Sequence, residues 1–332
     1  MAQRLNHDGI DTSDVDNERL AQSMTAYLLD SRAPSTSTKY SGYFEKFEQF
    51  CESKSVSAKP ASSMAVALYL THLMDSSKSL SVINSVLYAI KWKHSLHGYD
   101  DPTNDPFVKN LVESAKRLFS KPIVKKDVID SSMLISLCER FQPFDSLVHV
   151  RDLAMILLCY AGFLRFNDMS NLRCSDITFE NDFLTLHLRS SKTDVYREGR
   201  DVLVAKGSTI ACPYAMLQRY MILAGLDNKS ESYLFKPLLQ SKGVHSVVKK
   251  DKQLSYTRAR ECIVKKLELV APGLKLGTHT LRASGATSAA NMAGISDRCI
   301  KRHGRWKSDQ AKDGYISDSI EKKLMVTKCL GL

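Results

Sequence analysis

The chain has 332 residues and a formal net charge of +11, because 47 lysines and arginines outnumber 36 aspartates and glutamates. This excess of positive charge favours a polyanionic partner, nucleic acid first and an anionic membrane surface second. We expect two domains at this length, and neither a membrane-spanning helix nor a signal peptide, since the sequence lacks the apolar runs that these require.

The first half of the chain predicts a bundle of four or five short helices, in which apolar residues recur at helical spacing. Gly98 is a typical residue for the end of one helix. Asp105 is a typical N-cap residue, and Pro106 follows it at the first helical position of the next helix. The predicted helices cover residues 17–29, 37–51, 63–74, 80–98 and 105–119.

The second half begins after a basic stretch around Lys126 that has no sustained apolar period and contains Pro122. Between residues 176 and 205, apolar and polar residues alternate in stretches separated by polar turns, which predicts a small antiparallel sheet of three strands. The predicted helices of this half cover residues 146–162, 212–225, 255–270 and 280–294.

Together these patterns predict a mainly α protein, in which a helical N-terminal domain is joined to a mixed α+β domain that carries the sheet. The eight cysteines are spread singly, with no closely spaced pair, so we expect no structural metal site. The predicted divisions are an N-terminal extension, partly helical, at 1–33, a helical domain at 34–120, a linker at 121–130 and a second domain at 131–332.

Several basic and aromatic side chains of the second half are candidates for chemistry, and each also has an ordinary structural interpretation. Arg165 follows a helix end and could cap it. Lys192, at the tip of the predicted hairpin, could be an exposed turn lysine. His279 and Arg282 lie three positions apart, on one helical face, and could be a surface pair. Trp306, in the basic stretch Lys301–Tyr315, could belong to the core.

Taken together, these residue types suit work on a phosphodiester. Two guanidinium groups can clamp its non-bridging oxygens, a histidine can move a proton near neutral pH, and a lysine can protonate a leaving oxygen. A tyrosine can attack phosphorus, although its reference pKa of about 10 means that its surroundings must assist deprotonation. The arginines would supply the charge that a metal ion supplies elsewhere, so we expect no metal at such a site.

Six residues of the second half occur in the order, and at the spacings, of the tyrosine recombinase (phage-type integrase) family, which the chain resembles from about Ser35 to Tyr315. Asp168 stands three positions after the first of them, where the family usually carries an acidic residue. Residues 285–315 are also similar to recombinases of eukaryotic mobile elements, the Crypton and DIRS groups. The six residues are Arg165, Lys192, His279, Arg282, Trp306 and Tyr315.

The resemblance implies a SAM-like core-binding domain followed by a catalytic domain of the DNA breaking-rejoining type. Tyr315 would attack the phosphate, forming a 3′-phosphotyrosyl link and releasing a 5′-hydroxyl without metal or ATP. Both arginines would stabilise the transition state, with help from the histidine and the tryptophan. Lys192 would protonate the leaving oxygen, and Lys206, on the far side of the hairpin, is the alternative.

The implied partner is double-stranded DNA, held by a homotetramer on two sites, with no membrane involved. After Tyr315, Ile320 and Leu324, with Val326 or Leu330, make an apolar face on a short helix that either packs on its own domain or is exchanged with a neighbouring subunit. The implied location is the nucleus in a eukaryotic host and otherwise the cytoplasm. The expected DNA-binding residues are Lys91, Lys93, Lys121, Lys125, Lys126, Arg305 and Lys307.

Three other functions stay open at this stage. A type IB topoisomerase-like enzyme would use the same tyrosine chemistry without a tetramer. A domesticated, catalytically silent DNA-binding protein would keep the fold alone. A basic scaffold protein of another class would bind partners other than nucleic acid.

Overall fold

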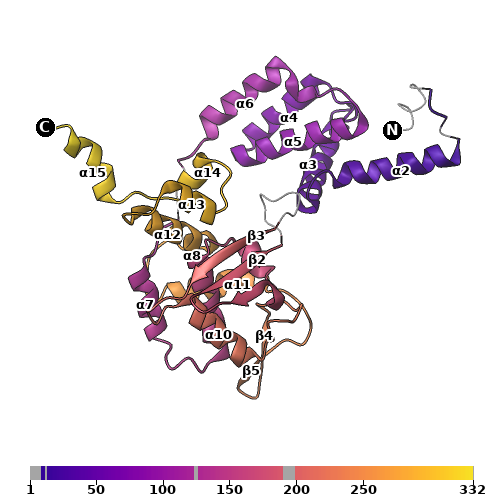
Figure 1. Ribbon diagram of the computed structural model, residues 1–332. Coiled ribbons are helices and arrows are strands. Elements are labelled where there is room, and N and C mark those ends of the chain that lie inside the picture. Colours follow the sequence, from indigo (N-terminus) through magenta and orange to yellow (C-terminus); the bar gives the residue numbers. More distant parts are fainter. Residues whose placement is uncertain (1–8, 12, 123–125, 190–198, 332) are drawn as a thin grey trace. The chain divides into compact units, whose positions relative to one another are not determined.

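The structure, a computed structural model, describes residues 9–11, 13–122, 126–189 and 199–331 (Figure 1). The chain divides into two compact units, Met1–Ile123 and Val124–Leu332. The division falls within the basic stretch expected as a linker. Among the helices that the structure describes, none is long and apolar enough to cross a membrane.

The first unit is helical, and local signals in the sequence fix where its helices begin and end. Ser62 and Ser79 accept hydrogen bonds from backbone N–H groups in the first turns of their helices, as N-cap residues do. Gly98 ends a helix with φ +70°, in the left-handed region. The elements are α2 (Val15–Asp30), α3 (Pro34–Ser53), α4 (Ser63–Asp75), α5 (Leu80–His97), the 3₁₀ helix η1 (Pro102–Asn104) and α6 (Pro106–Phe119).

The core of this unit lies between α3, α4, α5 and α6. Phe44 and Phe47 of α3 are fully buried and lie edge to face, with ring centroids 5.8 Å apart. Leu70 and Ile83, from the next two helices, are also fully buried. The helical face predicted for 37–51 is therefore the face that enters the core. In contrast, α2 has no buried residue.

The second unit is built around α8 (Leu147–Ala161), whose residues from Val150 to Cys159 are all buried. It packs against α10, α11 and α12, so a strongly apolar sequence becomes the central helix of the unit. The remaining helices are α7 (Ser131–Glu139), α9 (Phe166–Ser170), η2 (Cys174–Asp176), α10 (Pro213–Ala224), α11 (Tyr256–Leu267), α12 (Thr278–Asn291), α13 (Asp297–His303), α14 (Asp309–Asp313) and α15 (Ile320–Cys329).

The predicted three-stranded antiparallel sheet is confirmed, as β1 (Ile177–Phe179), β2 (Phe183–Leu188) and β3 (Arg200–Ala205) in that order. The alternation in the sequence becomes a two-sided sheet, because Leu184 and Leu186 point into the core while His187 is exposed. Leu188 pairs with Arg200, so the register of β2 and β3 runs the full length of both strands.

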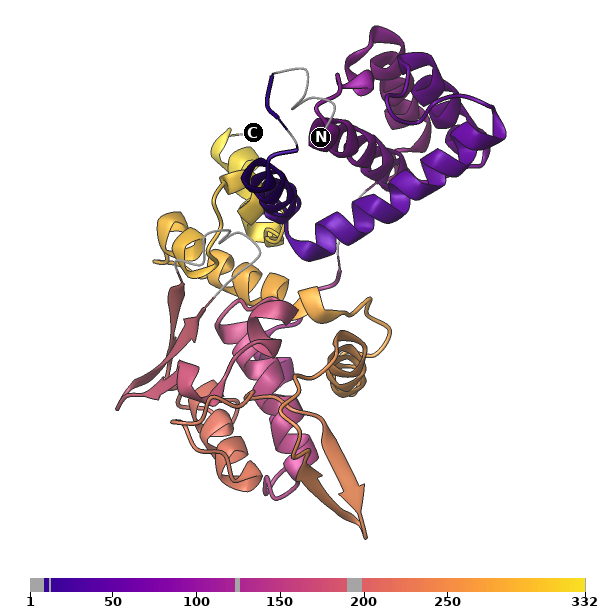
Figure 2. The ribbon, with the colours of Figure 1, turned by 90° about the vertical axis from the view of Figure 1, so that its right-hand side faces the viewer.

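A second sheet was not predicted. β4 (Leu238–Ser241) and β5 (Val244–Val247) form an antiparallel pair, and Figure 2 shows it on the side of α8 away from the three-stranded sheet. Lys242 and Gly243 connect the strands with φ values of +49° and +81°, which is the backbone of a two-residue hairpin turn. The expectation of one sheet was therefore incomplete, and the Lys-Gly pair was the signal for the second.

Candidate active site

Arg282 lies at the centre of the predicted site. It comes from the second turn of α12 and is fully buried. Its Nη1 donates to the carbonyl oxygen of Phe163, and its Nη2 donates to that of Gly304 at 2.5 Å. Its guanidinium carbon lies 4.5 Å from the ring centroid of Trp306 and 5.0 Å from that of Tyr315. One arginine therefore joins three segments that are far apart in the sequence.

The local field around Arg282 is strongly positive. Burial, with the nearby charges of Arg165 and Arg305, lowers the pKa of Arg282 to about 9. The group stays protonated at neutral pH, since the solution is then well below that pKa. Among the residues that the structure describes, three guanidinium groups share this region with one carboxylate, that of Asp168. Such an excess of positive charge attracts an anion such as a phosphate.

Asp168 organises the first arginine of the site. Its Oδ2 accepts a hydrogen bond from the backbone N of Arg165 at 3.0 Å and one from Arg305 Nη2 at 3.3 Å. Its side chain is almost fully buried, and Arg165 Nη1 lies 3.9 Å from the same oxygen. The acidic residue expected three positions after Arg165 thus ties that arginine's backbone to the centre of the site.

Unused hydrogen-bond donors remain in the site. Arg165 Nη1, Arg282 Nε and Trp306 Nε1 are buried without an acceptor among the residues that the structure describes. Donors from two arginines and a tryptophan match the oxygens of a phosphodiester.

Arg305 lies in different surroundings from those expected for a DNA-binding residue. It is one of the residues expected to bind DNA, yet it is only 4% exposed. Its Nη1 donates to the carbonyl oxygens of Gly162 at 3.0 Å and His303 at 2.9 Å. Its Nη2 donates to Phe163 O at 2.8 Å as well as to the carboxylate of Asp168. The side chain of Arg305 is thus bound within the site, beside Arg282, rather than displayed on the surface of the second unit.

Trp306 depends on the glycine two positions before it. Its ring is 6% exposed and packs on Phe163, with centroids 6.1 Å apart. A Cβ built on Gly304 would lie 1.8 Å from the indole ring, so no side chain fits there. This glycine was not among the predicted site residues, and its place in the His-Gly-Arg-Trp run was the signal for it.

Tyr315 lies beside the arginine and the tryptophan. Its ring centroid is 5.5 Å from that of Trp306 and 6.3 Å from that of His279, which lies exposed in the first turn of α12. Its carbonyl oxygen accepts from Thr287 Oγ1 at 3.4 Å, which ties the segment to α12. The structure therefore brings together five of the six residues predicted for the site: Arg165, His279, Arg282, Trp306 and Tyr315.

The sixth, Lys192, lies outside the described residues. Its alternative, Lys206, follows the last residue of β3 and lies with its Nζ 5.1 Å over the ring of Tyr214. The other end of β3, at Arg200, is close enough to act on the charge of Arg305. Lys206 therefore lies beyond the end of β3 opposite to Arg200.

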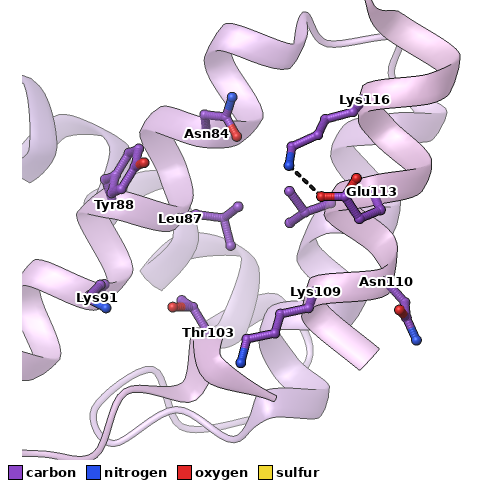
Figure 3. Close-up of a pocket in the computed structure, with 10 residues that line it drawn as sticks. Asn84, Leu87, Tyr88, Lys91, Thr103, Lys109, Asn110, Glu113 and Lys116 are labelled. Carbon is purple, nitrogen blue, oxygen red and sulfur yellow. Dashed lines mark hydrogen bonds and ion pairs between the residues drawn. The ribbon is translucent and has the colours of Figure 1, made fainter. Parts of the chain in front are cut away.

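The lysines expected to bind DNA differ in their surroundings. In the first unit, Lys91 lines a hollow of about 520 Å³ between α5 and α6, together with Lys109 and Lys116 (Figure 3). Lys91 Nζ lies 2.9 Å from Asp101 Oδ2. Lys93 is half-buried, with its Nζ 5.7 Å from the ring of Trp92. Lys121, Lys126 and Lys307 are exposed, and Lys125 lies outside the described residues.

With this fold and cluster in place, comparison with known proteins gives the family. Residues 124–321 match the model of the Phage integrase family, and the chain belongs to this family, whose members are the tyrosine recombinases. The chain is 26% identical over 307 residues to an integrase/recombinase xerD homolog of Selenomonas ruminantium, covering 90% of this chain and 86% of that protein. It is 25% identical over 333 residues to tyrosine recombinase XerA of Pyrococcus horikoshii, covering 96% and 98%.

A solved structure shares the fold. The XerH site-specific recombinase, in a post-cleavage complex with a palindromic difH substrate, matches with a TM-score of 0.57 and 15% identity, over 88% of this chain and 77% of that one. The predicted fold class, a mainly helical protein with a small antiparallel sheet and a tyrosine recombinase catalytic domain, is confirmed.

Proposed function

We propose that the protein is a site-specific DNA recombinase that cleaves and rejoins DNA through a tyrosine. The observation that carries the proposal is the position of Arg282, whose buried guanidinium lies against the rings of both Trp306 and Tyr315 and near the charge of Arg165. A buried guanidinium next to a tyrosine can hold a phosphate at the point where the phenol oxygen would attack it.

In the proposed reaction, the Tyr315 phenol gives up its proton to the His279 imidazole or to water, and its oxygen attacks phosphorus while the bond from phosphorus to the 5′-oxygen breaks. The DNA 3′ end becomes a phosphotyrosine, and the leaving 5′-oxygen takes a proton. The Arg165 and Arg282 guanidinium groups meet the charge that grows on the non-bridging oxygens. The His279 imidazole and the Trp306 N–H assist. A 5′-hydroxyl of a partner strand reverses the step, so one phosphodiester is exchanged for another without ATP.

Incubation with a nicked suicide DNA substrate, in buffer containing EDTA, tests this function. The nick lets a short fragment diffuse away after cleavage, so the reverse step is lost and the covalent protein–DNA adduct accumulates. A silent DNA-binding protein would bind the substrate without forming the adduct. A type IB topoisomerase-like enzyme would form the adduct and relax supercoiled DNA as a monomer, so sedimentation of the DNA complex separates it from a recombinase.

We propose Lys192 as the acid for the leaving oxygen, since Lys206 lies at the far end of β3 against Tyr214. Lys192→Ala is expected to cleave ordinary DNA poorly but to cleave a substrate whose 5′-bridging oxygen is replaced by sulfur, a leaving group that needs no proton. Lys206→Ala, the matched control, should cleave ordinary DNA at the parental rate. The reverse pattern would assign the acid to Lys206.

DNA contacts outside the site are proposed for the exposed lysines of both units. Lys91 shares its hollow with Lys109 and Lys116, and Lys121, Lys126 and Lys307 are exposed. Lysines at such positions bind phosphates without reading sequence. Removing one should weaken binding to all DNA sequences alike and lower the salt dependence of binding; an effect on one sequence alone would contradict this role.

We propose that α15 is exchanged between subunits in a homotetramer on two DNA sites. α15 has no buried residue, and Ile320, Val326 and Leu330 are 75%, 68% and 62% exposed. The start of the helix is held by Asn291, whose Oδ1 accepts from the backbone N of Ser319 at 3.1 Å. Apolar residues that the helix's own domain leaves exposed favour cover from a second subunit.

Truncation after Ser319 is therefore expected to leave a folded protein that binds a single DNA site but does not form the complex with two duplexes. The fold should survive because no residue of α15 is buried. A native gel with one and with two duplexes measures both properties. A truncated chain that still builds the two-duplex complex would place the assembly contacts elsewhere.

Within the family, we propose a place among recombinases of eukaryotic mobile elements of the Crypton and DIRS groups, on the similarity of residues 285–315 noted above. This placement would make the nucleus the site of action. A tree built from aligned family members tests it, and grouping with Xer-type recombinases instead would contradict it.

A further inference from the structure

Lys312 is a buried lysine that the proposed reaction does not use. It lies in α14, three positions before Tyr315, and is only 4% exposed. Its Nζ donates to Asp297 Oδ2 and lies 3.4 Å from Asp313 Oδ1 and 3.9 Å from Asp309 Oδ1. Lysines are almost never fully buried unless they are paired, and three carboxylates surround this ammonium. The question is what these ion pairs hold in place.

The contacts of Lys312 connect the tyrosine segment to the rest of the site. Asp297 is the first residue of α13, which ends at His303, next to the buried run from Gly304 to Trp306. The backbone carbonyl of Lys312 accepts a hydrogen bond from the backbone N of Tyr315 at 2.9 Å. The lysine thus holds α13 through its side chain and the tyrosine through its backbone.

α14 has little else to hold it in place. It is five residues long, and Lys312 is its one buried residue. A helix this short is not stable without tertiary contacts. A second ion pair, Lys301 Nζ to Asp309 Oδ1 at 3.0 Å, joins α13 to the first residue of α14. The attachment of α14 to α13 is thus made largely by charged side chains.

The surroundings of the ammonium favour its charged form. Burial opposes the charge, but the hydrogen bond and charge of Asp297, followed by those of Asp313, outweigh it and raise the pKa of Lys312. The three carboxylates are between 63% and 67% exposed. Replacing the lysine therefore leaves solvated carboxylates rather than buried charges, and the fold of the domain should survive.

We propose that Lys312 is a positioning residue for Tyr315: its ammonium clamps α14 to α13 through Asp297 and so fixes the tyrosine ring against Arg282 and Trp306. The inference rests on the proposed function, in which Tyr315 is the nucleophile. In such a reaction a displacement of about 1 Å at the attacking atom can lower the rate by on the order of a hundredfold.

The test compares Lys312→Met, Lys312→Arg and a control, Lys265→Met, which replaces an exposed lysine of α11. DNA binding, single-turnover adduct formation at saturating suicide DNA and amide hydrogen exchange of 309–316 without DNA are measured on the full chain. We expect Lys312→Met to bind DNA within about twofold of the parent, to form the adduct on the order of tenfold or more slowly, and to exchange faster in this segment. Lys312→Arg should restore most of the rate, and the control should match the parent.

Two results would overturn the proposal. One is a parental cleavage rate and parental exchange in Lys312→Met. The other is equal loss of DNA binding, melting temperature and cleavage, which would give Lys312 a purely structural role. If the parent itself forms no adduct, the proposed function fails, whereas the hydrogen exchange still reports whether Lys312 clamps α14.

Discussion

Tyr315→Phe is expected to abolish covalent adduct formation and to leave DNA binding near the parental level. The change removes only the phenol oxygen, while the ring keeps its contacts with Trp306 and with the guanidinium of Arg282. Without that oxygen no phosphotyrosine forms at this position. Denaturing gels of the suicide-substrate reaction, beside binding measured by gel shift, give both quantities.

Tyr256→Phe is the matched control. Tyr256 is the first residue of α11. Its hydroxyl accepts a hydrogen bond from Oγ1 of Thr278, the first residue of α12, at 3.4 Å, and its ring packs on Phe166. This variant should form the adduct at the parental rate. If Tyr315→Phe still becomes linked to DNA, another tyrosine is the nucleophile, with Tyr256 or Tyr196, which lies outside the described residues, as the first candidates.

Arg282→Lys is expected to lower the cleavage rate by a hundredfold or more, on the order of the loss of one oxyanion contact. Lysine keeps the charge but lacks the planar fork with which Arg282 reaches the carbonyl oxygens of both Phe163 and Gly304. The loss of these contacts also loosens the segment that carries Trp306, so the melting temperature should fall as well. Single-turnover cleavage and thermal unfolding measure the two effects.

Arg165→Lys separates the effect on cleavage from the effect on stability, because the Nη1 of Arg165 is without a hydrogen-bond partner among the residues that the structure describes. This variant should lose a similar share of cleavage with little change in melting temperature. Near-parental cleavage by Arg165→Lys would remove that arginine from the site. Near-parental cleavage by Arg282→Lys would mean that Arg282 has a purely structural role.

Most of the helices could be predicted because their signals are local. Ser79, Gly98 and Asp105 act as caps through their own side chains or backbone, and α8 is apolar enough to be recognised as a core helix. α13 and α14 were not predicted, since they have seven and five residues and too few apolar positions for a helical period.

The residue types of the candidate site could be predicted from the sequence, but their positions and burial in the fold could not. The order of Arg165, His279, Arg282 and Tyr315 along the chain showed that a phosphate-handling site was possible. It could not show that Arg305 would be buried, since Arg302, three positions earlier in the same basic stretch, is exposed. Packing separates them, because Arg305, with φ +58°, reaches the carbonyl oxygens of Gly162 and Phe163, whereas Arg302 stays at the surface.

Peptide mapping of the suicide-substrate adduct by mass spectrometry tests the central claim most directly. After digestion of protein and DNA, the proposed function predicts one modified peptide, containing Tyr315 with a 3′-phosphonucleotide on its phenol oxygen, and a free 5′-hydroxyl on the released DNA. The site geometry supports this outcome through the placement of Tyr315 beside Arg282. A link to any other residue, or a 5′-phosphate on the released strand, would contradict the account.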